Sequence, residues 1–168
     1  ELDGADSQTI TIGAGENTII FYYTIRKDLE LTVNHYDIAD KDKSAEDRVP
    51  LIQPTHSKNQ VFGSIPNILA LVEPIEGYEY VSSDPASVTI GTGENVVNLF
   101  YQRQKYNYTV HHHYEEDPTW DVSVPHEALF GEQVTYTERP MQNYTLDYVT
   151  GSPLTVSTEE NLNNIHVY

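Results

Sequence analysis

Three consecutive histidines, His111, His112 and His113, are the residues of this sequence whose types and spacing most directly invite chemistry. Alternate side chains of a β-strand share a face, so His111 and His113 would lie together and Glu115 would continue that face. Two imidazoles and a carboxylate are ligands that Zn²⁺ or Cu²⁺ accepts. The spacing therefore raises a metal site at His111, His113 and Glu115. The alternative is that this strand simply accommodates His beside Tyr, as His35-Tyr36 does earlier in the chain.

Aromatic side chains are a second set with a chemical use, since the chain holds 13 Tyr and one Trp. Tyr and Trp stack on the faces of sugar rings while their polar ends hydrogen-bond to hydroxyl groups. Trp120 follows an acidic segment and a proline, which predicts a loop position. We name Trp120, Tyr114 and Tyr136 as candidate ligand contacts. The competing interpretation is that recurring tyrosines pack in a core or between repeats.

Clusters of carboxylates raise the possibility of Ca²⁺, which takes six to eight oxygen ligands. Neither cluster in this chain has the residue order of a dedicated calcium loop, so the pattern favours solvated acidic faces. The clusters are Asp37, Asp40 and Asp42, and Glu115, Glu116, Asp117 and Asp121.

Composition excludes several classes of function. The 168 residues include 26 Asp+Glu and 9 Lys+Arg, for a formal net charge of −17. That charge repels phosphates, so we expect no nucleic-acid partner. The absence of Cys excludes thiol chemistry, and no apolar run approaches the roughly 20 residues of a membrane span, so we expect no membrane insertion. No hydrolase, P-loop or dinucleotide motif is present, so we expect neither an enzyme nor a cofactor.

The elements that would position these residues recur along the chain. Residues 12–23 and 90–101 share Ile-Gly-x-Gly-Glu-Asn followed by an apolar and aromatic run. A weaker third copy places Phe62-Gly63 on Phe130-Gly131 and Val88 on Val156. The sequence therefore predicts residues 1–23 as the C-terminal hairpin of a preceding repeat, 24–101 as one repeat and 102–168 as a second, shorter repeat.

Local patterns predict strands and tight turns within each repeat. Residues 9–12 with 18–23, and 87–90 with 96–101, read as hairpins, and 163–168 ends the third copy. We expect positive φ among the loop glycines, because such turns need it. These glycines are Gly13, Gly15, Gly91 and Gly93.

Alternating residues predict the strands that open each repeat. One strand is expected at 29–36, with Leu29, Leu31 and Val33 on one face, and another at 106–114. Residues 37–60 read as a solvated loop excursion and 133–137 as a middle strand. Residues 65–72 fit either a short helix or a strand, because their apolar residues follow helical spacing.

Several of these features together resemble a known family. They are the opening pattern Tyr108-Thr109-Val110-x-His112-x-Tyr114, the mid-repeat Phe130-Gly131 before Val134-Thr135, and hairpins that end in Tyr22-Tyr23 and Phe100-Tyr101. They resemble the mucin-binding (MucBP-like) repeats of Gram-positive cell-surface adhesins, over both repeats and the tail copy. The Asp-Gly pair common after the family's opening strand is missing here. The resemblance implies a mainly β fold, with α+β as the alternative, built of small tandem repeats of β-grasp or ubiquitin-like character.

The resemblance also implies a function. A chain of this kind would be an extracellular repeat region at the cell wall or surface of a Gram-positive bacterium. It would bind host mucin glycans or glycoprotein, and neighbouring repeats of the same chain would be its other partners. The alternative is a passive stalk that projects a distal binding domain, which abutting repeats and dispersed negative charge also suit. A metal-responsive domain is a third class and depends only on the His run.

Overall fold

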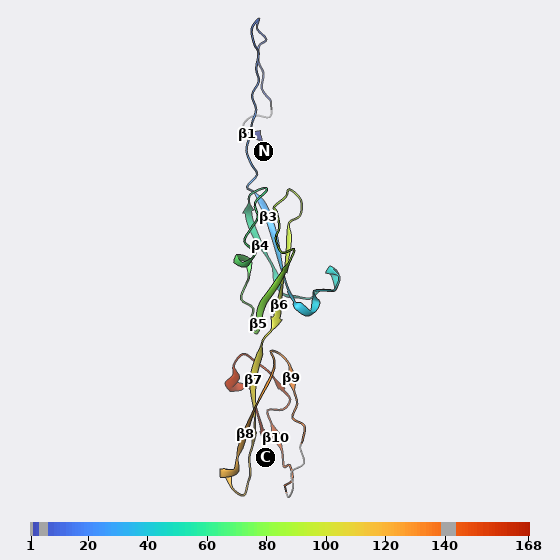
Figure 1. Cartoon of the computed structure of the whole chain (residues 1–168), viewed down its shortest axis with the longest axis vertical. Coiled ribbons are helices and arrows are strands. Elements are labelled where there is room, and N and C mark those ends of the chain that lie inside the picture. The colour runs from blue at the N-terminus through green and yellow to red at the C-terminus, as the bar shows by residue number, and fades with distance from the viewer. Residues whose placement is uncertain (1, 4–6, 139–143) are drawn as a thin grey trace. The chain divides into compact units, whose positions relative to one another are not determined.

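The computed structural model of this chain describes residues 2–3, 7–138 and 144–168. These residues form mainly β-structure, which confirms the predicted class, with short 3-10 helices between the strands (Figure 1). The strands are β1 (Leu2–Asp3), β2 (Tyr22–Tyr23), β3 (Leu29–Asp37), β4 (Pro50–Gln60), β5 (Tyr78–Asp84), β6 (Val96–Arg103), β7 (Lys105–His112), β8 (Val122–Leu129), β9 (Gln133–Val134), β10 (Val149–Thr150), β11 (Leu154–Thr155) and β12 (Asn164–Val167). The 3-10 helices are η1 (Ile38–Asp40), η2 (Ala45–Asp47), η3 (Ile68–Leu71), η4 (Pro118–Trp120) and η5 (Glu160–Leu162). A helix with the length and apolar character needed to cross a membrane is not found in the described ranges.

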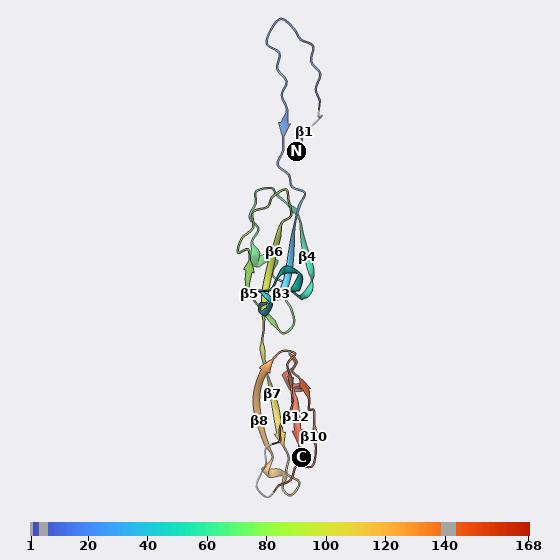
Figure 2. The same cartoon turned by 90° about the vertical axis from the view of Figure 1, so that its right-hand side faces the viewer.

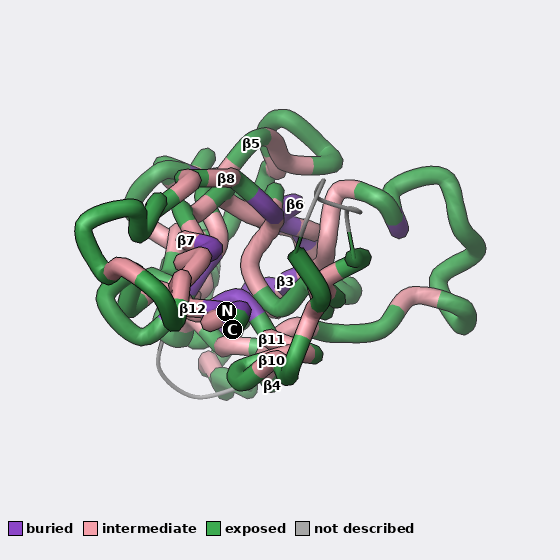
Figure 3. The backbone as a smooth tube through the Cα atoms, turned by 90° about the horizontal axis from the view of Figure 1, so that it is seen from below, coloured by how far each residue is buried: buried purple, intermediate pink, exposed green. Residues whose placement is uncertain are grey.

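The chain divides into two compact units. The first takes the residues up to 35 together with 52–72 and 82–99, and the second takes 36–51, 73–81 and 100–168. Buried stretches lie within β3, β6 and β7, while most connecting loops are exposed (Figure 3). The predicted repeat boundaries, after residues 23 and 101, rest on sequence recurrence and stay a prediction.

Two four-stranded sheets have the same order when their strands are counted along the chain (Figures 1 and 2). The orders are β4-β3-β6-β5 and β8-β7-β12-β10. In the second sheet β7 and β12 are parallel neighbours, with Val110 opposite Ile165 and His111 opposite His166. Strands β8 and β10 pair antiparallel at its edges. The last strand of the chain therefore lies beside β7 and its histidines.

Alternation in the opening strands places one face of each in a core. Leu29, Leu31 and Val33 are exposed by only 6%, 0% and 1%, which confirms the predicted buried face of β3. His35 continues that face and is also fully buried. The second opening strand was expected at 106–114, and β7 spans 105–112.

The core of the second unit is built around the parallel pair of strands. Val110 of β7 and Ile165 and Val167 of β12 are its buried centre. Partly buried side chains pack against them from β7, β9, β10, β11 and the segments between these strands, namely Tyr108, Val134, Tyr136, Leu146, Val149 and Leu154.

Two polar strands differ from the sequence expectations. Residues 37–60 were expected to be a loop, but 50–60 form the eleven-residue strand β4, and β8 at 122–129 was not predicted. Both strands contain proline, namely Pro50 and Pro54 in β4 and Pro125 in β8, and both lie at a sheet edge. An edge position tolerates proline because one side of the strand needs no N–H donor. Because of their prolines and polar side chains, these segments lack the alternating apolar pattern that predicts a strand.

The predicted hairpins are wrong in their first strands. Residues 9–12 and 87–90 form no strand. In the first segment Tyr22 and Tyr23 pair antiparallel with Asp3 and Leu2 instead. The following strands are present, as β6 and β12 in the two later copies.

The turn glycines also differ from expectation. None of the four expected positions has positive φ, namely Gly13, Gly15, Gly91 and Gly93. An asparagine side chain closes each loop instead. Asn95 Oδ1 accepts from the N–H of Gly91 at 2.8 Å, and its Nδ2 lies 3.1 Å from the Gly91 carbonyl oxygen. Asn17 makes the equivalent bonds to Gly13. A side chain that bonds to the loop backbone removes the need for a left-handed residue.

Two middle segments are short. Strand β9 covers 133–134 of the strand predicted at 133–137. Residues 65–72 are neither an α-helix nor a strand, since they contain the 3-10 helix η3 at 68–71. The side chain of Asn67 accepts from the N–H of Leu69 and caps this helix.

Candidate functional site

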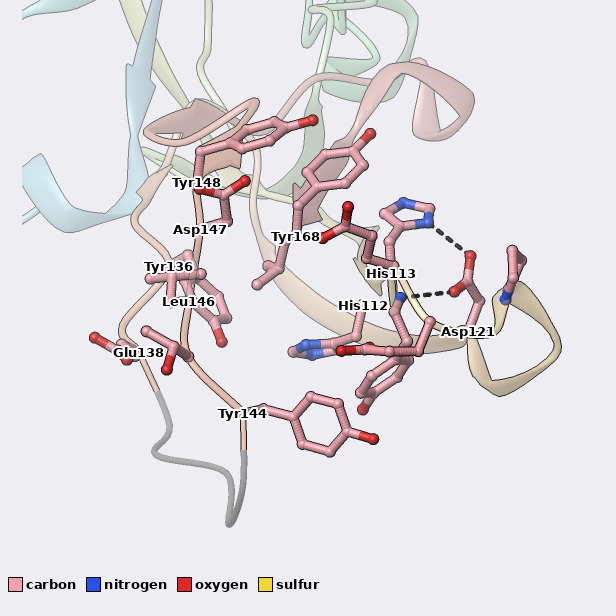
Figure 4. Close-up of a pocket in the computed structure, with 16 residues that line it drawn as sticks. His112, His113, Asp121, Tyr136, Glu138, Tyr144, Leu146, Asp147, Tyr148 and Tyr168 are labelled. Atoms are coloured by element: carbon pink, nitrogen blue, oxygen red, sulfur yellow. Dashed lines mark hydrogen bonds and ion pairs between the residues drawn. The ribbon is translucent and has the colours of Figure 1, made fainter.

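A cleft of about 730 Å³ lies in the second unit (Figure 4). The end of β7, the η4 loop, the segment after β9, residues 144–148 and the end of β12 form its walls. Five tyrosines line it, namely Tyr114, Tyr136, Tyr144, Tyr148 and Tyr168. Five carboxylates line it as well, namely Glu115, Glu116, Asp121, Glu138 and Asp147. The cleft therefore combines aromatic faces with negative charge.

One wall of the cleft continues into a ladder of stacked rings. Tyr148 stacks on Tyr168 with ring centroids 4.4 Å apart, and Tyr168 stacks on His113 at 4.6 Å. His113 stacks on His166 at 5.4 Å, and His166 stacks on His111 at 4.8 Å. The interplanar angles lie between 13° and 18°. Strands β7 and β12 supply two of these rings, His111 and His166, and His113 and Tyr168 directly follow the ends of these strands, so the ladder follows from their parallel register.

The histidine nitrogens in this ladder already have partners. His111 Nδ1 lies 2.8 Å from the Ser123 hydroxyl, and its Nε2 lies 3.0 Å from Asn164 Oδ1. His113 Nδ1 lies 2.7 Å from a carboxylate oxygen of Asp121, and its Nε2 lies 3.1 Å from His166 Nδ1. A hydrogen bond between two imidazole nitrogens needs one donor and one acceptor, so both rings of that pair cannot be charged.

These contacts do not form the metal site expected from His111, His113 and Glu115. The rings stack instead of converging on a point, and their nitrogens bond to other side chains. Within the described residues, no group of three or more His, Cys, Asp or Glu side chains is arranged to hold a metal ion. In the acidic cluster near η1, Asp40 instead pairs with Lys43 at 2.6 Å.

Electrostatics in the ladder favour neutral imidazole at one position. Burial lowers the pKa of His166, and the neighbouring His111 and His113 lower it further. The pKa of the Asp121 carboxyl is lowered by the hydrogen bond from the Tyr114 backbone N–H and then by the bond to His113. His166 therefore resists protonation, whereas Asp121 favours its charged form.

We expect the second unit to lose stability as the pH falls from about 7 to about 5. The pKa of His166 in the folded chain lies below its ordinary value of 6.5. In this window His166 therefore binds more protons in the unfolded chain than in the folded one. The stability that neutral His166 contributes is present above pH 6.5 and is lost on acidification. Each extra proton changes the free energy of unfolding by at most about 1.4 kcal/mol per pH unit. Urea unfolding at a series of pH values, followed through the amide NMR signals of Val110 and Ile165, measures this slope.

Two variants separate the cluster from general acid effects. His166→Gln should flatten the slope above pH 5, while His56→Gln, which lies in the first unit, should leave it unchanged. Equal slopes in the parent protein and in His166→Gln would contradict the assignment of this pH dependence to His166. Protonation of Asp121 adds a loss of the same sign only near and below its ordinary value of 3.8.

The cleft brings together several residues that the sequence singled out. Tyr114, Tyr136, His113 and Glu115 all line it. Trp120 is 52% exposed at the end of η4, as a loop residue should be, but it is not among the residues that line the cleft. Its role as a ligand contact stays a prediction.

Sequence reasoning missed other parts of the site. His166 lies far from the His run in the chain, and only the parallel pairing of β12 with β7 brings it there. Tyr144, Tyr148 and Tyr168 also went unassigned. Residues 144, 146 and 148 would share one face of a regular strand, yet Leu146 packs on the core while Tyr144 and Tyr148 are exposed. Strand periodicity therefore gives no signal for these tyrosines.

Comparison with known proteins gives no further identification. No protein-family model and no curated protein matches this chain.

Proposed function

We propose that this chain is an extracellular repeat region of a Gram-positive surface adhesin, and that the cleft of its second unit binds glycans of host mucin or glycoprotein. The observation that carries the proposal is the gathering of five tyrosines around one cleft. Tyr144, Tyr148 and Tyr168 remain 41%, 50% and 39% exposed there. Exposed aromatic faces beside polar groups are suited to sugar rings, which have apolar faces and hydroxyl edges.

We also propose that the two sheets belong to tandem β-grasp-like repeats. Their equal strand order supports this, as does the central parallel pair of first and last strands in the second sheet. Equivalent backbone bonds support it too. The N–H of Thr32 donates to the Asn95 carbonyl oxygen, and that of Thr109 donates to the Asn163 carbonyl oxygen, both at 2.9 Å.

The assignment of residues 1–23 to a preceding repeat is part of the same proposal. Phe21, Tyr22 and Tyr23 are 39%, 65% and 75% exposed. Their counterparts in the matching copy, at 99–101, are at most 1% exposed. Asn95 also lies 3.0 Å from the Glu30 carbonyl oxygen of β3, a contact that links the loop to an opening strand. The exposed apolar residues suit a strand whose opening partner belongs to another repeat.

Binding of purified mucin to the 168-residue protein tests the function. We expect saturable binding that falls about fivefold in Tyr148→Ala, because one stacked aromatic ring contributes on the order of 1 kcal/mol. Tyr144→Ala should act in the same direction. Trp120→Ala measures whether the neighbouring loop takes part.

Tyr23→Ala is a matched control, since it removes an exposed tyrosine of the first unit. It should leave binding unchanged, and far-ultraviolet circular dichroism should show that every variant is folded. Equal binding by Tyr148→Ala and the parent protein would reject the cleft as the site. The absence of saturable binding would reject the function.

A passive stalk is the second candidate, and two backbone hydrogen bonds favour it. The Gln104 N–H donates to the Gly77 carbonyl oxygen at 2.8 Å, and the Phe130 N–H donates to the Gln104 carbonyl oxygen at 2.9 Å. The turn before β5 and the turn after β8 are thus both tied to the residue between β6 and β7. Such ties hold consecutive elements in place without any ligand.

A further inference from the structure

The carboxylates of the cleft come from separate elements and surround its space. Glu115, Glu116 and Asp121 precede or follow η4, Glu138 follows β9, and Asp147 precedes β10. Figure 4 shows Asp121, Glu138 and Asp147 on different sides of the cavity. Negative charge therefore borders the cleft on several sides.

Little in the described structure offsets this charge. The described residues that line the cleft include no Lys or Arg. Apart from Asp121, which bonds to His113, none of these carboxylates forms an ion pair within the described part of the chain. Residues 102–168 as a whole hold ten Asp or Glu and three Lys or Arg. Because Asp and Glu side chains carry negative charge at neutral pH, the cleft presents a negative field to any ligand.

A ligand must be compatible with this negative field and must also pack against the aromatic faces. An acidic sugar would bring its carboxylate or sulfate among like charges, and proteins stabilise such groups with Arg, Lys or convergent N–H donors. A neutral sugar has no such penalty, because its hydroxyl groups can donate hydrogen bonds to carboxylates while its ring faces stack on tyrosine.

We propose that the cleft selects neutral glycans and excludes sialylated and sulfated ones. This inference rests on the proposed glycan-binding function and specifies its ligand class. Like-charge repulsion is screened by salt, so the discrimination weakens as ionic strength rises.

The test uses the 168-residue protein and two matched probes, a neutral mucin-type oligosaccharide and the same oligosaccharide with a terminal sialic acid. Isothermal titration or NMR titration at about 50 mM salt should give at least tenfold weaker binding for the sialylated probe. At about 500 mM salt the difference in affinity between the two probes should become severalfold smaller. Sialidase treatment of purified mucin should raise binding in the same assay.

Charge-neutralising variants assign the effect to the cleft. The double variant Glu138→Gln, Asp147→Asn should narrow the gap between the probes, because both side chains are exposed and line the cleft. Glu127→Gln makes a single such change on β8 outside the cleft and should keep the gap. Equal or tighter binding of the sialylated probe overturns the selectivity and leaves glycan binding standing. Failure of both probes and of mucin overturns the proposed function itself.

Discussion

Replacing Gly77 by alanine should destabilise the second unit by about 3 kcal/mol or more. Gly77 is buried with φ +74°, a conformation that costs an L-residue about 1–2 kcal/mol. A Cβ atom there would also lie 2.1 Å from the Phe130 ring. The ring cannot move away easily, because Tyr78 and Tyr106 hold it edge-on at 6.1 and 6.3 Å. Overpacking of this kind costs about 1–3 kcal/mol more.

Gly63 is the matched control for the backbone. Its φ is +78°, and no atom lies within 4 Å of the position of an added Cβ. Gly63→Ala should therefore cost only the conformational part, about 1–2 kcal/mol. Hydrogen exchange of β7 and β12 amides reports on the second unit, and exchange in β3 reports on the first. A Phe130→Leu change should recover part of the Gly77→Ala loss, and its failure to do so would contradict the steric explanation.

Replacing Asn95 by alanine should cost about 2–4 kcal/mol. Its side chain is 7% exposed and bonds to Gly91 and Gly93 within the loop and to the Glu30 carbonyl oxygen of β3. Truncation leaves these partly buried backbone groups without their partner, and an unpaired group that is shielded from water costs about 1–3 kcal/mol. The midpoint of urea unfolding, read through the Leu31 and Val97 amide signals, measures the loss.

Asn17 provides an unusually close comparison within the same chain. It makes the same loop bonds to Gly13 and Gly15, but the loop is exposed. Water can replace its side chain, so Asn17→Ala should change stability by less than about 0.5 kcal/mol. Similar losses for Asn17→Ala and Asn95→Ala would show that burial and the contact with Glu30 contribute little.

The asparagine that ends each of these loops explains what the sequence could and could not predict about the turns. The recurring Gly-x-Gly-Glu-Asn predicts a turn, and its glycines suggest positive φ because glycine so often marks a turn. In the third copy the glycines are gone, yet Asn163 remains and its Oδ1 accepts from the Ser157 N–H at 3.0 Å. Val156 therefore takes the place of Ile90, not of Val88, because the loop before Asn163 is two residues longer.

Strands facing the core were predictable, and the assembled site was not. The alternation of Leu29, Leu31 and Val33 reports burial directly, which is why β3 was found. Pairing between β7 and β12 depends on contacts across more than fifty residues, which no local pattern encodes. Because the cleft lies where the ends of these strands meet, three of its five tyrosines are not predicted by local patterns.

The parallel pairing of β7 with β12 also determines how the second unit would respond to tension. A pull applied at Lys105 and Val167 draws two neighbouring strands along their own axes in opposite directions, with Thr109 opposite Asn164 and His112 opposite Val167. The hydrogen bonds between them are then loaded together, in shear, instead of opening one after another as in a zipper. Rupture of this pair would require the simultaneous loss of all of these hydrogen bonds.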